Sequence, residues 1–481
     1  MDTHTLVIGA GTGGATLAGL LAEHGSEPVV LLEAGPDYGT RADAWPADML
    51  DARVVPLSHD WGYTSGTTYP DRVLDFPRAK IVGGCSAHNG CTAAVGAHAD
   101  WADYPWPMAE LEPLLELVLE RFRVRALTLD ELTPVQRAFV EAGRAQGLPL
   151  AHDLHELTAG VGIGPMAVNV VDGVRWNSAF AFLDGVRDRL TVRGGAHVER
   201  VIVEAGRARG AVVDGREVRA ERVVVAGGAY GSPTILLRSG IGPADELRGC
   251  GIDVVADLPV GENLLDHPCV ALDFSGSERF RETLAATAYH PDEQTVGRAR
   301  SSRCDDGPYD IHVFLVAGAN TGHPGLPPIS MYGGAMKARS RGRVTLHQGH
   351  TRIDHRYLSD AEGHDLQVLT EARDLLERMA ADAGFAAFLG ERVTPADFDI
   401  RARVVNYCHP AGTCALGSVV DAHGQVKGVD GLYVADASVM PTMTRGNPNL
   451  PTAVIAARIA FGLVGAERPR NDLAEAPNAP T

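Results

Sequence analysis

The sequence predicts an α/β fold that contains a Rossmann-like domain. Three observations predict it. A glycine-rich turn lies between an apolar strand and a helix, the next strand ends in an acidic residue, and the chain has 481 residues of which 45% are hydrophobic. A chain of this size can bury a large core and is expected to form two or three domains.

The first element is a short apolar strand at residues 6–8, followed at once by the glycine-rich turn. Gly9, Gly11 and Gly14 form the pattern G-x-G-x-x-G, and a helix is predicted over residues 15–24. In a dinucleotide-binding turn the first glycine permits the tight turn, the second lets a pyrophosphate approach the backbone, and the third lets the helix pack closely on the strand. The helix N-terminus then offers unpaired N–H groups to the phosphates.

The second strand, predicted over residues 28–32, ends in Glu33, at the usual distance for an acid that binds a ribose hydroxyl. Strand, helix, second strand and acid together predict a dinucleotide site, whereas the glycines alone also fit a tight turn in another α/β protein. After Ala34 an irregular segment rich in Asp, Gly and Pro replaces the simple strand–helix alternation. The motif itself does not separate FAD from NAD.

Composition argues against several classes of partner. The net charge of -18, from 43 Lys and Arg against 61 Asp and Glu, repels nucleic acid and anionic lipid, and it also serves solubility. No apolar run approaches the ~20 residues that span a bilayer, and no secretory signal is visible. The seven cysteines are odd in number and scattered, so no disulfide framework is expected. These features predict a cytoplasmic protein, and no metal site is predicted.

Further blocks follow one another along the chain. They occupy residues 78–90, 228–243, 258–268, 407–414, 431–436 and 447–452. Together with the N-terminal turn they resemble, in family order from residue 5 to about residue 463, the recurring blocks of the glucose–methanol–choline (GMC) oxidoreductase family. The resemblance covers nearly the whole chain and implies that the cofactor is FAD.

The resemblance also implies a domain organisation. An FAD-binding, Rossmann-like domain is expected from residues 1–150, 191–265 and 405–466. A second, substrate-binding domain of α+β type, carrying an antiparallel sheet, is expected from residues 151–190 and 266–404. Residues 467–481 are polar and rich in Ala and Pro, and a frayed tail is predicted there.

The residues expected to bind FAD come from these blocks and from the strands that precede them. They are Gly9, Gly11, Thr12, Gly13, Gly14, Glu33, Ala34, Arg78, Gly83, Gly84, Ser86, His88, Asn89, Gly90, Cys91, Val198, Ala226, Gly227, Asp436, Ala437, Asn447 and Pro448. Gly83 and Gly84 would let the backbone pass close to a flat ring system. Asp436 closes a predicted strand, where a carboxylate can accept from a ribityl or ribose hydroxyl or can cap the helix that follows.

Two residues are expected to do the chemistry of alcohol oxidation, in which flavin N5 takes the hydride and the protein supplies a base. His409 matches the family's catalytic histidine, and histidine suits a base because its pKa lies near neutrality. Asn447 matches the second member of the catalytic pair, and its amide can stabilise the developing alkoxide. Without the resemblance His409 would be read as an ordinary core or surface histidine, and Asn447 as a turn residue before Pro448.

His88 is a departure from most of the family, which has an aliphatic residue at this position. Choline-oxidase-like members share the run at 83–89, and in them the histidine is bonded covalently to the flavin. The resemblance therefore implies a covalent link from His88 to FAD, with a histidine that only packs against the flavin as the alternative.

The substrate is less specified. Choline-oxidase-like enzymes hold a quaternary ammonium with aromatic rings and a carboxylate, for which Trp61 and Asp273 are candidates. Cys408, however, stands where an aromatic residue would be expected. Choline is thus one candidate among primary alcohols, and oxygen or another acceptor would reoxidise the flavin. A lyase on the same scaffold and a degenerate flavin-binding protein are the competing interpretations, and a homodimer is left open.

Overall fold

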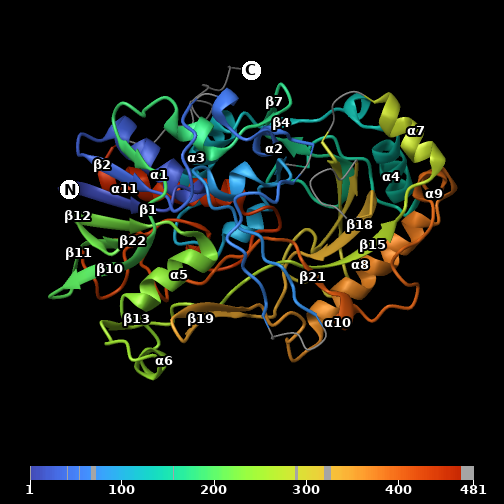
Figure 1. Ribbon diagram of the computed structural model, residues 1–481. Helices are drawn as coiled ribbons and strands as arrows, with labels where there is room; N and C mark the ends of the chain where they lie inside the picture. Colours follow the sequence, from blue (N-terminus) through green and yellow to red (C-terminus); the bar gives the residue numbers. More distant parts are fainter. Residues whose placement is uncertain are drawn as a thin grey trace, which may run out of the picture.

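Two large sheets organise the chain in the computed structural model, which describes residues 2–40, 42–53, 55–66, 72–154, 156–287, 291–318 and 327–466 (Figure 1). The first sheet has seven strands, in the order β10-β11-β12-β1-β2-β9 with β22 paired to β12. Its strands are β1 Asp2–Ile8, β2 Val29–Leu32, β9 Thr191–Arg193, β10 Val198–Glu204, β11 Arg207–Val213, β12 Arg216–Val225 and β22 Leu432–Val434.

The parallel part of this sheet brings distant segments to one edge. β1 pairs in parallel with β2 and β12, and β12 pairs in parallel with β22. The carboxyl ends of these four strands therefore meet, and ligands of open α/β sheets bind at such an edge. The residues that follow the strands here are Gly9, Glu33, Ala226 and Ala435.

Helix α1 (Thr12–His24) begins directly after the glycine turn and packs on the sheet beside α11 (Asn449–Val464), an almost entirely apolar and buried helix. Gly14 permits this packing, because a Cβ on Gly14 would lie 1.8 Å from the Gly9 carbonyl oxygen. Any other residue at position 14 would force the helix away from the strand.

The second sheet is antiparallel throughout, in the order β21-β15-β18-β17-β16-β5. Its strands are β5 Gly162–Pro165, β15 Pro268–Phe274, β16 Glu293–Ala299, β17 Ile311–Ala317, β18 Ile329–Ala335 and β21 Val405–Asn406. One face packs on α4 (Pro134–Ala145), α8 (His364–Ala380) and α9 (Ala383–Leu389) in a separate hydrophobic core. Because side chains alternate along a strand, Ile311 and Val313 face this core while His312 and Phe314 face away from it.

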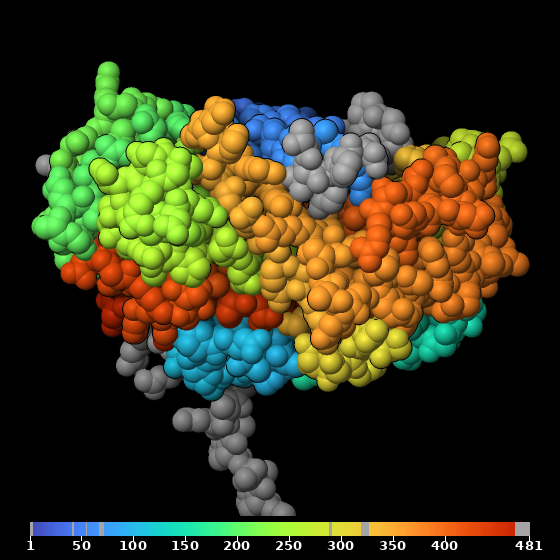
Figure 2. All heavy atoms as spheres, turned by 90° about the horizontal axis from the view of Figure 1, so that it is seen from below, coloured from blue at the N-terminus to red at the C-terminus, as the bar shows by residue number. Residues whose placement is uncertain are grey.

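Shorter elements connect the two sheets. They are η1 Ala42–Ala44, α2 Ala47–Leu50, η2 Gly84–Ala87, β3 Thr92–Ala93, η3 His98–Trp101, α3 Met108–Arg121, β4 Arg125–Ala126, η4 Leu129–Glu131, β6 Ala167–Val168, β7 Val170–Val171, β8 Val174–Arg175, η5 Ala179–Leu183, α5 Gly228–Arg238, β13 Ile241–Gly242, α6 Ala244–Gly249, β14 Ala256–Asp257, α7 Glu278–Ala286, β19 Arg343–His347, β20 His350–Asp354, α10 Ile400–Arg403 and η6 Ala437–Val439. Figure 2 shows the same division on the surface, with the green and lime segments of β10 to α6 at one end and the orange segments of α8 to α10 at the other.

The predicted α/β fold, with a second domain that carries an antiparallel sheet, is confirmed. Helix α4 and strand β21 lie within the ranges assigned to the FAD-binding domain. However, α4 packs in the core of the second sheet, and β21 pairs with β15 of that sheet. The apolar face of α4, with Val135 and Phe139, explains its position. The domain boundaries stay predictions, and the frayed tail at 467–481 lies outside the described residues. Among the described residues, no helix is both long and apolar enough to cross a membrane.

Candidate active site

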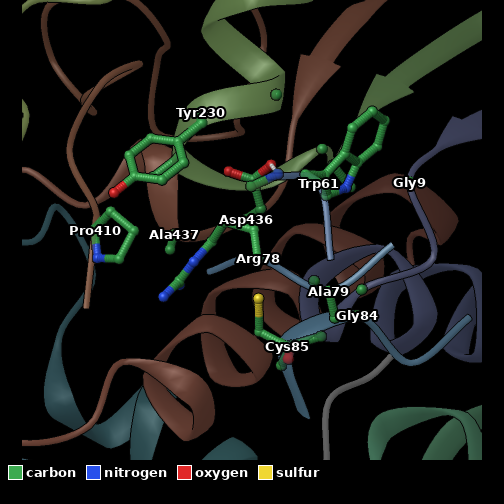
Figure 3. A pocket seen from close by; sticks show the side chains of 18 of the residues that line it. Gly9, Trp61, Arg78, Ala79, Gly84, Cys85, Tyr230, Pro410, Asp436 and Ala437 are labelled. Atoms are coloured by element: carbon green, nitrogen blue, oxygen red, sulfur yellow. Dashed lines mark hydrogen bonds between the residues drawn. The ribbon is translucent and has the colours of Figure 1, made fainter. Parts of the chain in front are cut away.

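A cavity of about 480 Å³ lies at the carboxyl edge of the first sheet. Its lining includes residues from the glycine turn, from the segment at 78–90, from strand β10, and from the segments at 226–238, 408–410 and 436–452 (Figure 3). Seventeen of the predicted site residues line it: Gly9, Gly11, Thr12, Gly13, Glu33, Ala34, Arg78, Gly84, Asn89, Val198, Ala226, Gly227, His409, Asp436, Ala437, Asn447 and Pro448.

The glycine turn leaves room for a ligand. A Cβ on Gly11 would meet only the Gly84 Cα, at 3.7 Å, and would otherwise project toward the cavity that Gly11 lines. Gly84 has φ +51°, and a Cβ there would lie 2.5 Å from the Gly11 Cα. The two backbones thus approach so closely that only glycine fits at position 84. This bare backbone surface beside the helix N-terminus suits the pyrophosphate of FAD.

Glu33 stands at the end of β2 with both carboxyl oxygens bonded. It accepts from the Ala10 amide at 3.0 Å and from the Gly35 amide at 2.8 Å. Burial raises the pKa of Glu33 to about 7, although the two backbone N–H groups act in the opposite direction. Each carboxyl oxygen has a second lone pair, so the group can still accept from a ribose hydroxyl in the cavity.

Asp436 follows β22 and lies opposite Arg78 in the cavity (Figure 3). Its carboxylate accepts from the Gly228 amide at 2.7 Å, from Ser232 Oγ at 2.5 Å and from the Ser438 amide at 2.8 Å. The last bond caps η6, so the capping role considered for Asp436 is present in the structure and is compatible with a place in the cavity wall. Burial raises the pKa of Asp436 above its usual value.

Six predicted cofactor residues do not line the cavity: Gly14, Gly83, Ser86, His88, Gly90 and Cys91. Ser86 shows why, because its Oγ donates to the Gly83 carbonyl at 2.6 Å and accepts from the Ser178 amide at 2.9 Å. Ser86 therefore holds the turn of η2 together from behind. Whether these six touch the cofactor stays a prediction.

The His88 ring is buried, and its Nε2 has no hydrogen-bond partner among the described residues. Burial lowers the pKa of His88 to about 3, and the charges of Arg78 and Arg175 add to this. The imidazole is therefore neutral at physiological pH. A buried polar atom without a partner is costly, and this one marks a place where a group absent from the protein chain fits.

The predicted catalytic pair lies together. Asn447 Nδ2 is 3.3 Å from His409 Nε2 and also donates to Thr92 Oγ1 at 3.2 Å. Burial, followed by the neighbouring His267, Arg78 and His312, holds the pKa of His409 well below its ordinary value. His409 is therefore a neutral imidazole, the form that can accept a proton.

A third residue, which the sequence analysis missed, orders the protons of this pair. His267 Nε2 lies 3.1 Å from the Thr444 carbonyl, and its Nδ1 lies 2.9 Å from His409 Nδ1. A carbonyl only accepts, so His267 carries its proton on Nε2 and presents a lone pair at Nδ1. Burial lowers the pKa of His267 to about 3, which keeps it neutral. This network assigns the His409 proton to Nδ1 and leaves the lone pair on Nε2, facing Asn447.

Asp266 fixes the backbone on which both histidines stand. Its Oδ1 accepts from the amides of His267, at 2.8 Å, and His409, at 2.9 Å, while Oδ2 accepts from Tyr357 at 2.7 Å. Burial raises the pKa of Asp266 to about 6. Both residues could have been singled out from the sequence, because Asp266 and His267 lie in the segment 258–268 that resembles the family.

Of the two residues considered for a choline cage, Trp61 lines the cavity and Asp273 does not. Trp61 stacks on Tyr63, with ring centroids 6.0 Å apart, and lies against His197 near β10. Asp273 accepts from Ser330 at 2.7 Å with one carboxyl oxygen and from Thr394 at 3.0 Å with the other. Both carboxyl oxygens of Asp273 are thus bonded within the protein.

Comparisons with known proteins agree with this geometry. Two family models, both described as GMC oxidoreductase, match residues 3–269 and 338–456. The mitochondrial choline dehydrogenase of Homo sapiens is 31% identical over 95% of this chain and 88% of its own length. The oxygen-dependent choline dehydrogenase of Paraburkholderia phymatum is 32% identical over 96% of this chain and 92% of its own. Because the human relative is mitochondrial, the cytoplasmic location stays a prediction.

Solved structures give the same result. Pyridoxine 4-oxidase from Mesorbium loti superposes with a TM-score of 0.82 and 26% identity, covering 97% of this chain and 100% of that chain. Formate oxidase superposes with a TM-score of 0.82 at 22% identity, covering 95% of this chain and 97% of its own, which supports the fold alone. The family matches, the relatives and the cavity together show that the chain belongs to the GMC oxidoreductase family and is an FAD-dependent enzyme acting on CH–OH donors.

Proposed function

We propose that the protein oxidises an alcohol to an aldehyde or ketone, with His409 as the base. The observation that carries this proposal is the proton order along Thr444, His267 and His409, which leaves the lone pair of His409 Nε2 beside the amide of Asn447. An alcohol hydroxyl that displaces the Asn447 N–H from this lone pair can give up its proton to Nε2. The freed Asn447 N–H can then donate to the alcohol oxygen as negative charge develops on it.

His267 acts in this proposal as a positioning residue. Without its Nδ1 lone pair, the His409 ring could carry its proton on either nitrogen, and the molecules with Nε2–H could not act as base. The T-shaped packing of His267 on His409, with ring centroids 5.2 Å apart, and the stacking of Tyr407 on His409 at 4.3 Å also hold the ring plane.

FAD bound in the cavity supplies the acceptor for the hydride that leaves the alcohol carbon. The bare backbone at Gly11 would take the pyrophosphate and Glu33 a ribose hydroxyl. Asp436 would accept from a further hydroxyl of the cofactor. The support for this assignment is that all three line one cavity and come from elements that meet at the strand ends.

We further propose that His88 forms a covalent bond to FAD through Nε2. The ring is neutral and buried, and Nε2 has no partner in the described part of the chain, so its lone pair is free to act as a nucleophile. In the net reaction a C–N bond replaces one C–H bond of the flavin methyl group. The released protons and two electrons pass to the acceptor that normally reoxidises the flavin.

We propose the electron acceptor that reoxidises the flavin and the alcohol substrate as classes of compound. Relatives named as an oxygen-dependent dehydrogenase and an oxidase support reoxidation by oxygen or by another acceptor. The names of the choline dehydrogenase relatives make choline a candidate substrate. Asp273 does not line the cavity, which argues against it as the carboxylate that would hold a quaternary ammonium there.

Mixing the purified protein with a panel of alcohols in the absence of oxygen tests the proposal. We expect the yellow colour to bleach with at least one alcohol and to return when oxygen or an artificial acceptor is admitted. Release of an aldehyde from any of these alcohols while the yellow colour persists would favour a lyase on this scaffold.

Acid denaturation tests the His88 bond separately. We expect the flavin mass to remain on a peptide that contains His88. Release of all FAD into the supernatant would remove the bond and leave alcohol oxidation standing.

A further inference from the structure

The face of the second sheet that points away from its helices carries a buried guanidinium that forms no ion pair with any residue the structure describes. Arg298, on β16, is fully buried, and its Nε and Nη2 have no hydrogen-bond partner among the described residues. Nη1 makes one long hydrogen bond, 3.4 Å, to the Ala159 carbonyl. The guanidinium lies over the Tyr309 ring, 4.6 Å from its centroid. Within the described ranges, no carboxylate forms an ion pair with its nitrogens, and the charges of Asp100 and Asp153 act on it from further away.

His312 lies directly beside Arg298, and its polar atoms also lack hydrogen-bond partners among the described residues. The two residues are register partners across β16 and β17, so their side chains leave the sheet on the same face. Both ring nitrogens of His312 are buried and lack partners in the part of the chain that the structure describes. Burial, with the charges of Arg298 and His267, keeps the pKa of His312 well below its usual value. His312 is thus a neutral ring that can donate one hydrogen bond.

This face is the one that borders the catalytic histidine. Phe314, the next residue of β17 on the same face, stacks on Tyr407 at 4.7 Å, and Tyr407 stacks on His409 at 4.3 Å. Tyr407 Oη is also buried without a partner in the described structure, and the charge of Arg298 acts on it. The unpartnered groups therefore form a cluster of Arg298, His312 and Tyr407 next to the proposed base.

Physical chemistry points to an anion as the missing partner. A buried carboxylic acid can avoid an unpaired charge by taking up a proton, but a guanidinium cannot lose its own. Glu293 on β16, which acts on Tyr407, shows how a buried acid becomes neutral. Burial and then Asp292 raise the pKa of Glu293 to about 8, which leaves it neutral near pH 7. An unpaired buried guanidinium is strongly destabilising, and a carboxylate matches its fork with two parallel hydrogen bonds.

We infer that the substrate is an alcohol that also bears a carboxylate, held by Arg298 and His312 while its hydroxyl lies at His409. The inference rests on the proposed alcohol oxidation and narrows it to one substrate class. It also explains why a quaternary ammonium is a poor fit, since the fixed positive charge of Arg298 repels it. Tyr407 would donate its hydroxyl hydrogen to the same carboxylate.

The test compares alcohols that differ in charge and share the hydroxymethyl end. The holoenzyme is mixed without oxygen with ω-hydroxycarboxylates of increasing chain length, with neutral primary alcohols of the same lengths, and with choline and its uncharged carbon isostere. We expect at least one hydroxycarboxylate to reduce the flavin with an apparent Kd roughly 10-fold or more below that of its neutral counterpart. Equal affinity for the charged and neutral members, or a preference for choline, would overturn the inference while the proposed oxidation stands. Failure of every alcohol to reduce the flavin would remove both.

Arg298→Gln sharpens the test, with the exposed Arg300→Gln on the neighbouring turn as the matched control. We expect Arg298→Gln to raise the apparent Kd of the hydroxycarboxylate about 10- to 100-fold and that of neutral alcohols by much less. Arg300→Gln should change neither. If Arg298→Gln weakens charged and neutral alcohols equally, the residue has a structural role and the inference fails. Should Arg298→Gln not retain FAD, His312→Gln, which removes one donor and no charge, is judged by the same difference between charged and neutral alcohols.

Discussion

The edge of the first sheet and the face of the second sheet border the same site but are built in opposite ways. At the first edge, the site is formed mainly by backbone. Gly11 and Gly84 carry no side chain, and the carboxylates of Glu33 and Asp436 accept hydrogen bonds from backbone amides. At the second face, Arg298 Nε and Nη2 and both ring nitrogens of His312 have no hydrogen-bond partner among the described residues. In our proposal the first edge holds the cofactor with backbone that an added side chain would displace. The second face would contact the substrate through side chains that single substitutions can change.

The histidine pair lies between these two regions, and breaking it should have the largest effect. His409→Ala is expected to slow anaerobic flavin reduction by roughly 10² or more, because it removes a positioned general base. FAD content should stay close to that of the wild type. The exposed His423→Ala is the control and should have no effect. An unchanged reduction rate in His409→Ala would take His409 out of the mechanism.

Removing His267 should cost less, and another side-chain acceptor at this position should partly restore the rate. His267→Leu is expected to slow flavin reduction about 10- to 100-fold, less than the loss of the base itself. Burial is the largest cause of the low pKa of His409, so in the wild type the base stays neutral as pH falls below 6.5 and the reduction rate should stay level there. Burial remains in His267→Leu, so its rate should be lower but should stay level over the same pH range.

His267→Gln, which keeps a side-chain acceptor, is expected to recover part of the rate. A His267→Gln enzyme as slow as His267→Leu would show a structural role for His267 in place of control over the proton.

The backbone character of the first edge can be tested at Gly84. A Cβ there would lie 2.5 Å from the Gly11 Cα on a backbone with φ +51°, a strain of roughly 1–3 kcal/mol. Gly84→Ala should therefore weaken FAD binding by about 10-fold, measured as FAD content after gel filtration with His88 replaced by Ala in both variants, so that no covalent bond retains the cofactor. Gly249→Ala, where an added Cβ meets open space, should retain full FAD. Equal FAD content in the two variants would contradict a cradle made by close backbone approach.

The smallest effect is expected at Asn447. Asn447→Ala removes one amide donor beside His409 and should slow flavin reduction by roughly 10-fold, with FAD retained and the apparent substrate Kd changed little. Asn447→Asp is the sharper comparison, because a negative charge at the same place would oppose an alkoxide and should slow reduction more than Ala does. Faster reduction in Asn447→Asp would contradict the proposed role of the amide.

The contrast between the regions also explains what the sequence could predict. The glycine turn, Glu33 and the paired blocks at 78–90 and 407–414 are local patterns, so both the fold and the cavity lining could be anticipated. His267 stood within a matching block but was passed over, because its role depends on a contact with a residue far along the chain. Arg298 and His312 carry no local pattern at all. Only the pairing of β16 with β17 brings them together beside Tyr407.

The most direct test of the central claim follows one turnover with a deuterated alcohol. A reducing alcohol carrying deuterium at its carbinol carbon is mixed anaerobically with the enzyme, and flavin colour and aldehyde are followed together. Transfer of that hydrogen at a site governed by His409 predicts one equivalent of aldehyde per reduced FAD, at a rate several-fold slower than with the unlabelled alcohol. Aldehyde formed while the FAD stays yellow, or bleaching that yields no carbonyl product, would contradict the account.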